Sequence, residues 1–144
     1  MKNNESSCIN SECNYSDVAK LVLRFTVGFL LLFHGIAKIN YGVSFVEELL
    51  ASKGLPTIIA YGAYIGEIVA PIMLIIGFKV RIASIIIFFT LIMAIFLGHL
   101  NDFFTLSEVG AWAMEVQIFY LMGCLAIFLQ GAGKYSIDGC IKNK

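Results

Sequence analysis

The sequence predicts an all-α membrane protein, a four-helix transmembrane bundle with a short interfacial helix between the first and second spans. Two observations carry this prediction. The 144-residue chain is 59% hydrophobic, with a mean hydropathy of +0.85, which exceeds the usual composition of soluble domains. Only 14% of the residues are charged, and the charges are concentrated in the tails and turns. Lipid is therefore the expected solvent for most of the surface.

Four apolar runs are each close to the length of about 20 residues that a helix needs to cross a hydrocarbon core of roughly 30 Å. The second run contains Glu67 and Pro71, which a spanning helix tolerates where neighbouring helices cover its backbone. Between the first two runs, residues 38–56 combine charged residues with an apolar side and end at a Gly-Leu-Pro break, a pattern that predicts a short interfacial helix. The four runs cover residues 18–37, 57–77, 82–100 and 109–129.

The runs define one transmembrane domain, residues 18–138, between two cytoplasmic tails. Residues 1–17 are polar and lack apolar periodicity, so we expect a disordered, mobile tail there and not a signal peptide. Residues 139–144 form the C-terminal tail. Cys8 and Cys13 lie in the first tail, but no histidine or second close pair completes a metal site with Cys140. Free thiols are the expected state.

The distribution of basic residues predicts the orientation, because cytoplasmic loops retain an excess of Lys and Arg. With four spans, the two tails and the second loop share one face. That face carries eight basic residues and the opposite face carries two, Lys38 and Lys53, so both termini are expected in the cytoplasm. The eight are Lys2, Lys20, Arg24, Lys79, Arg81, Lys134, Lys142 and Lys144.

Several ionisable side chains fall at membrane depth, where each costs about 2.5 to 3.5 kcal/mol on insertion scales and normally faces the bundle interior. At 1.5 Å per residue, Glu67 lies near the midplane. Four further residues from three helices converge on the outer half of the bilayer. They are His34, Lys38, His99 and Glu115. We expect these five residues to be candidates for ligand binding or proton relay.

The first helix presents a face that is both small and polar, since Arg24, Gly28, His34, Gly35 and Lys38 share an arc of about 120°. Small residues let helices approach closely, so this helix is expected to line the bundle centre. We expect Arg24 to pair with Glu67 as a structural polar core.

Two alternatives remain for these residues. In one alternative, the ionisable groups serve only to neutralise one another, Arg24 with Glu67 and Lys38 with Glu115, and so fix helix register. His34, His99 and Glu115 would otherwise form a three-ligand metal set, but no local ligand spacing supports one, and no metal is expected. Histidine changes charge near neutral pH, which suits proton exchange with a redox ligand.

At these residues the sequence resembles the DoxX family of small membrane proteins. Several short segments carry this similarity, which runs from about Leu21 to Asp138. The order and spacing of these segments are more specific than any one of them. The pieces are LVLRF around Arg24, FHGIAK from Phe33, KGLP from Lys53, Glu67, GFKVR from Gly77, His99, Glu115 and GKYSID from Gly133.

The resemblance implies a four-helix bundle whose relatives include membrane subunits of thiosulfate:quinone oxidoreductase and partners in thiol-redox and oxidative-stress complexes. We therefore expect a subunit or partner of a quinone-linked or thiol-linked redox system in the bacterial inner membrane, either non-catalytic or quinone-binding. The sequence has no haem, flavin or iron–sulfur motif, so electrons would come from partner proteins. No covalently bound cofactor is expected, and quinone is the candidate ligand.

Two other classes of function remain open. One is a small transporter for protons or a solute, which would require a homo-oligomer because one four-helix unit shows no inverted repeat. The other is a membrane scaffold for soluble redox enzymes. Nucleic acid is excluded as a partner, because the formal net charge is zero and no basic stripe is present.

Overall fold

A computed structural model describes residues 3–98, 104–106 and 110–142, and the side chains within residues 15–98, 104–106 and 110–141. Within these ranges the regular elements are helical, and the β pairing is one isolated bridge between Leu106 and Trp112. The elements in chain order are α1 (Asn3–Tyr41), α2 (Ser44–Ser52), the 3-10 helix η1 (Thr57–Tyr61), α3 (Gly62–Tyr64), the π-helix η2 (Ile65–Val69), α4 (Ala70–Ile76), α5 (Val80–Gly98), α6 (Glu115–Gln130) and α7 (Ile137–Lys142). This confirms the all-α class.

Three helical segments in the described part of the chain are long and apolar enough to cross a membrane: Tyr15–Tyr41, Thr57–Ile76 and Val80–Gly98. The first three predicted runs correspond to these segments. Helix α6 is apolar but spans only 16 residues. The predicted start of the fourth run was too early, because Gly110 has a φ of 80° and Met114 lies outside the helix at its N-terminal boundary. A fourth span therefore stays a prediction.

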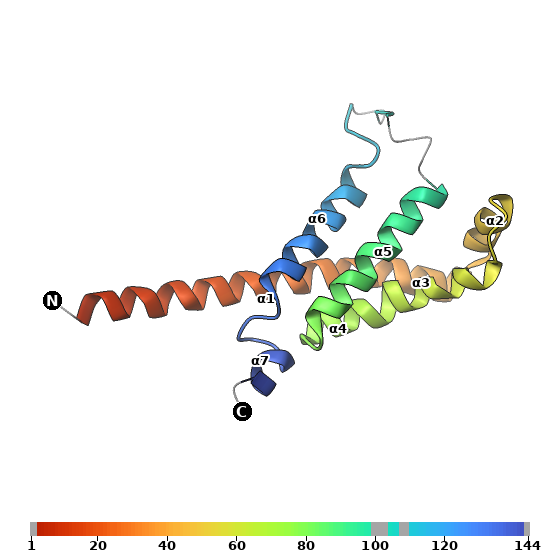
Figure 1. The fold of residues 1–144 in the computed structure, drawn as a ribbon. Helices are drawn as coiled ribbons and strands as arrows, with labels where there is room; N and C mark the ends of the chain where they lie inside the picture. Colours follow the sequence, from red (N-terminus) through yellow and green to blue (C-terminus); the bar gives the residue numbers. More distant parts are fainter. Residues whose placement is uncertain (1–2, 99–103, 107–109, 143–144) are drawn as a thin grey trace.

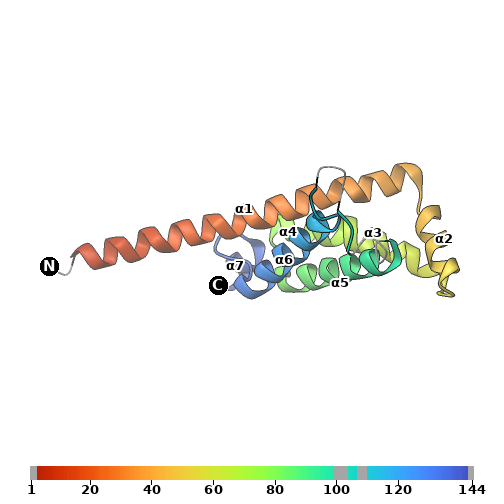
Figure 2. The ribbon, with the colours of Figure 1, turned by 90° about the horizontal axis from the view of Figure 1, so that it is seen from above.

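Helices α5 and α6 lie side by side and run obliquely to α1 and α4 (Figure 1). Helix α1 packs along α4 and η2, and α5 packs against α4 and α6. Helix α2 lies at one end of the molecule, whereas α7 and the turn between α4 and α5 lie at the other (Figure 2). Helix α2 forms within the segment where the sequence predicted a short interfacial helix, and its place in the interface stays a prediction.

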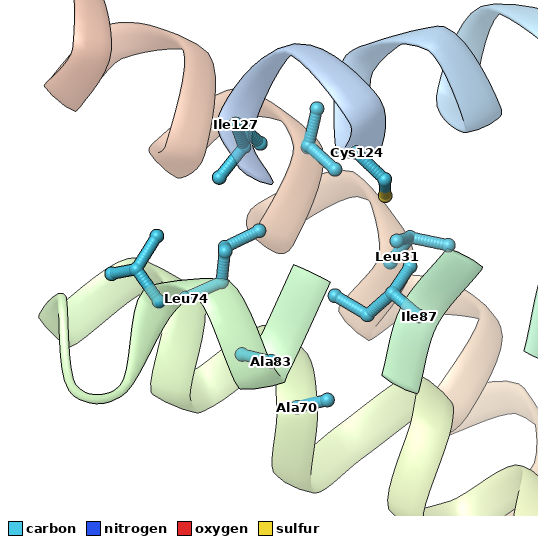
Figure 3. Close-up of a cluster of buried hydrophobic side chains, with 9 residues drawn as sticks. Leu31, Ala70, Leu74, Ala83, Ile87, Cys124 and Ile127 are labelled. Carbon is cyan, nitrogen blue, oxygen red and sulfur yellow. The ribbon is translucent and has the colours of Figure 1, made fainter. Parts of the chain in front are cut away.

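The main core lies where α1, α4, α5 and α6 meet (Figure 3). Its side chains are small or branched and nearly inaccessible: Val27, Leu31, Ala70, Leu74, Val80, Ala83, Ile87, Cys124 and Ile127. A second, smaller cluster of Val43, Leu50, Ala60 and Leu97 holds α2 against η1 and α5. Outward-facing positions are also apolar, including Phe25, Phe29 and Phe33 along α1. A lipid environment accounts for apolar residues on both sides of the helices.

Two glycines allow α1 to approach the second span closely. A Cβ at Gly28 would lie 2.9 Å from the carbonyl oxygen of Pro71, and a Cβ at Gly35 would collide with the carbonyl oxygen of Glu67. Backbone atoms cannot move aside as a flexible side chain can. The predicted small face of the first helix is therefore confirmed as its contact face with η2 and α4.

The end that carries α7 is joined by hydrogen bonds between distant segments. The buried Arg24 donates from Nη2 to the carbonyl oxygen of Tyr135 at 2.6 Å. Asp138 accepts from the backbone N–H groups of Lys79 at 2.8 Å and Val80 at 3.0 Å, and so caps the N-terminus of α5. Its own N–H donates to Gly77 at 3.0 Å. The closing GKYSID segment thus fixes the turn between α4 and α5.

The backbone of residues 3–17 continues helix α1, whereas the sequence predicted a disordered tail at 1–17. A helix already nucleated by its apolar continuation adds residues at little cost, and this segment contains neither Gly nor Pro. Asp17 is also held, since it accepts from the backbone N–H of Lys134 at 3.1 Å. Mobility of the tail stays a prediction.

Replacing Gly35 with Ala is expected to destabilise the fold by about 1 to 3 kcal/mol, because the new methyl group must displace backbone atoms of η2. The measurement is the thermal unfolding midpoint of the detergent-solubilised protein. Gly62→Ala is the matched control, since a Cβ at Gly62 meets nothing within 4 Å. Equal midpoints for the two variants would contradict the close approach of α1 and η2.

Candidate functional site

A pocket of about 550 Å³ lies at the end of the molecule that carries α2, between that helix, α1, the second span and α5. Its walls are mostly apolar. Its polar side chains are His34 and Lys38 from α1, Glu67 from η2 and Thr90 from α5. The apolar lining includes Phe45, Leu49, Leu50, Phe89, Met93 and Leu97. This volume is in the range of small-molecule sites, which combine apolar walls with a few polar groups.

Lys38 and Glu67 form an ion pair in the wall of the pocket. Lys38 donates from Nζ to Oε1 of Glu67. The side chains are 25% and 10% exposed, respectively, so the pair is largely removed from solvent. The second carboxylate oxygen of Glu67, Oε2, is buried and has no hydrogen-bond partner among the described residues. A buried oxygen of this kind has an unused capacity to accept a hydrogen bond.

The local helix geometry explains how Glu67 comes to lie there. Residues 65–69 form a π-helix, in which the N–H of Ala70 donates to Ile65, five residues back. Pro71 has no N–H and cannot donate to the carbonyl of Glu67, the bond that a regular α-helix would require. That carbonyl instead faces Gly35 of α1. Single π turns of this kind occur frequently at functional sites.

Neighbouring groups position the two ends of the pair. The hydroxyl of Tyr64 donates to the carbonyl oxygen of Lys38 at 3.2 Å. Gly66 allows α5 to approach, since a Cβ there would lie 2.6 Å from Thr90 Cβ. His34 is exposed and lines the pocket one turn before Lys38. Its ring meets Tyr120 of α6 edge to face, with centroids 6.5 Å apart.

The expected pairing of Arg24 with Glu67 is wrong. Arg24 lies against Gly77, at the opposite end of the second span from the pocket. Ten residues separate Gly77 from Glu67, which corresponds to roughly 15 Å along a helix and exceeds the reach of the arginine side chain. The sequence does not give the register of α1 against the second span, and that register puts Arg24 level with Gly77. Lys38 is the partner of Glu67.

The alternative pairing of Lys38 with Glu115 is also wrong, because the carboxylate that pairs with Lys38 is that of Glu67. Glu115 is the first residue of α6 and is exposed, and it does not line the pocket in the part of the chain that the structure describes. His99 lies outside the described residues. Among those that are described, no group of three His, Cys, Asp or Glu residues could hold a metal ion. The structure thus brings His34, Lys38 and Glu67 together.

Sequence reasoning did not find the role of Tyr64, Thr90 or helix α2 in this site. Tyr64 and Thr90 are single hydroxyl residues inside apolar runs, and no periodic pattern distinguishes them. A signal did exist near Glu67, since the Gly66 to Pro71 segment combines a helix-weakening and a helix-breaking residue around one charge.

Replacing only one of Lys38 and Glu67 is expected to destabilise the protein more than replacing both, because a single substitution leaves the other charge unpaired. Lys38→Met or Glu67→Gln should each cost about 2 kcal/mol, and the double variant should cost less than the sum. Thermal unfolding of all four proteins in detergent measures the coupling. Strictly additive effects would contradict a direct interaction between these side chains.

Comparison with known proteins supports one family. The sequence model described as DoxX matches residues 19–100, more than half of the chain and the part that contains His34, Lys38 and Glu67. No curated protein and no solved structure shows significant similarity to the chain. Together with three helices that are long and apolar enough to cross a bilayer, the match identifies an integral membrane protein. The chain belongs to the DoxX family.

Proposed function

We propose that the pocket beside the Lys38–Glu67 pair binds the headgroup of a quinone, and that the protein is a membrane subunit or partner of a quinone-linked redox system. One observation carries the proposal. A buried carboxylate oxygen that has no hydrogen-bond partner among the described residues, a lysine and a histidine lie in a mostly apolar pocket of about 550 Å³. A quinone has the matching chemistry, with polar oxygens on an apolar ring and chain.

The polar side chains suit both redox states of such a ligand. Lys38 and His34 carry N–H donors for the carbonyl oxygen of a quinone, whereas Glu67 Oε2 accepts from the hydroxyl of a quinol. Reduction of a quinone to a quinol takes up two electrons and two protons. In this proposal the electrons come from a partner protein, and the exposed His34 exchanges protons between the ligand and the surroundings.

The distribution of basic residues supports the proposed topology, with both termini in the cytoplasm of a bacterial cell and the pocket in the outer half of the inner membrane. Arg24, Lys79 and Lys134 lie at the end that carries α7, as their contacts with Tyr135, Asp138 and Asp17 indicate. Lys38 and Lys53 lie toward the end that carries α2. The excess of positive charge is therefore at the α7 end.

The proposal is tested by titrating the purified protein with short-chain benzoquinol and naphthoquinol analogues in anaerobic calorimetry, because the Glu67 carboxylate accepts from the hydroxyl that only the reduced ligand carries. Glu67→Gln is expected to weaken binding about tenfold, because a charge-assisted hydrogen bond is lost. His34→Ala is expected to weaken binding less, because the imidazole is exposed and therefore gains less from a hydrogen bond to the ligand than a buried, desolvated group does. Glu48→Gln, an exposed carboxylate on α2 outside the pocket lining, is the matched control.

The result that would overturn the proposal is equal affinity for the analogues in all four proteins, or no binding by the wild type. Folding of Glu67→Gln is checked independently by its unfolding midpoint. A folded variant that retains full affinity would show that the carboxylate does not contact the ligand.

A further inference from the structure

A second cavity, of about 770 Å³, lies at the opposite end of the molecule from the proposed quinone pocket. We call it the basal pocket. It is formed by the turn between α4 and α5, the loop between α6 and α7, and Asp17 of α1. Two glycines of that loop, Gly131 and Gly133, have φ values of 74° and 73°, which a side chain would strain. The loop backbone can therefore curve around the cavity.

The acidic groups of the basal pocket are already paired, whereas its basic side chains form no ion pair in the part of the chain that the structure describes, where Nζ of Lys79 lies 5.5 Å from the ring centroid of Phe78. Asp138 uses both carboxylate oxygens to cap α5. Asp17 accepts from the backbone of Lys134 and lies 3.6 Å from Nζ of Lys20. The remaining charged lining is Lys79, Arg81 and the Lys134 side chain, all exposed. Three cationic groups, from the α4–α5 turn, the start of α5 and the α6–α7 loop, thus surround a cavity large enough for a phosphate-bearing headgroup.

An apolar crevice of about 240 Å³ lies between α5 and α6, near the basal pocket. On α5, Arg81 of the pocket is followed by Ser84, Ile85 and Phe88 of the crevice at the spacing of one helix face. Helix α6 forms the other wall of the crevice with Cys124 and Phe128, and it ends at Gln130 of the pocket. The pocket and the crevice have no lining residue in common, but they lie one helical turn apart along α5, and we call the two together a groove. Its crevice has no polar surface.

We propose that this groove binds an anionic phospholipid, with the phosphate held by Lys79, Arg81 and Lys134 and one acyl chain lying in the α5–α6 crevice. A soluble phosphate compound would use the same cationic groups but would leave the crevice empty. The apolar crevice favours the lipid. Basic pockets beside membrane helices are known to recognise lipid headgroups on the face where positive charge accumulates.

The surroundings place the basal pocket at the level where headgroups lie. The second span ends at Ile76 and α5 begins at Val80, on either side of the turn that forms the pocket. Helix α7, directly after the loop, presents Ile137 and Ile141 outward with 42% and 63% of their surfaces exposed. Exposed isoleucines one helical turn apart, next to lysines, fit the boundary between acyl chains and headgroups.

The test uses native mass spectrometry of the full chain released from detergent micelles, with phosphatidylglycerol and phosphatidylcholine of identical acyl chains as probes. The wild type is expected to retain phosphatidylglycerol preferentially. Arg81→Gln should weaken that binding about fivefold, and Arg81→Gln with Lys134→Gln about twenty-five-fold, because each basic group near the surface contributes comparably. Lys53→Gln, an exposed lysine on the opposite side of the bundle, should leave it unchanged.

Two further experiments distinguish a bound phospholipid from a bound soluble anion. Ile85→Trp is expected to fill the crevice and to weaken the binding of both lipids equally, since that part of the groove carries no charge. Glycerol 3-phosphate and inorganic phosphate should displace phosphatidylglycerol only at far higher concentrations. Displacement at comparable concentrations would overturn the lipid assignment in favour of a soluble anion. Equal losses in Arg81→Gln and Lys53→Gln would overturn the site itself, and neither outcome bears on quinone binding.

Discussion

The rest of this structure depends on the close approach of α1 to the second span. In a bilayer, helices gain little from hiding apolar surface, because lipid tails are as apolar as the side chains. Contact must come from backbones that meet at short distance. Gly28 and Gly35 are two helical turns apart on one face of α1, and they admit the backbone of Pro71 and Glu67. This contact sets the register of α1 against the second span, and the register brings Lys38 to Glu67.

Polar interactions occupy the two ends of the bundle, while its centre is apolar. At one end Arg24 and Asp138 join α1, the α4–α5 turn and the C-terminal segment. At the other, Lys38 and Glu67 join α1 to the π-helix. Arg24 and Lys38 are 14 residues apart on one helix, roughly 21 Å. The fold therefore keeps its two charged regions separate, and each has its own cavity.

Much of this arrangement followed from the sequence, and the parts that did not have physical reasons. Length and hydropathy located the first three long helices, and the glycine face of α1 was correctly assigned to the bundle centre. The partner of Glu67 was not, because the sequence does not give the register of α1 against the second span. In the structure that register puts Arg24 level with Gly77, ten residues from Glu67. The start of α6 was misplaced because the apolar residues before Glu115 belong to a turn.

The π-helix around Glu67 contains one residue more per turn than an α-helix. If that additional residue were absent, the part of the second span before it would rotate by about 100° relative to α4 and shift by roughly 1.5 Å. Tyr64, Ala60 and the contacts that hold α2 would then face a different neighbour, while Pro71 and the main core stayed in place. The composition of the pocket wall therefore depends on a single supernumerary residue, and insertion or deletion there would rebuild the pocket without altering the core.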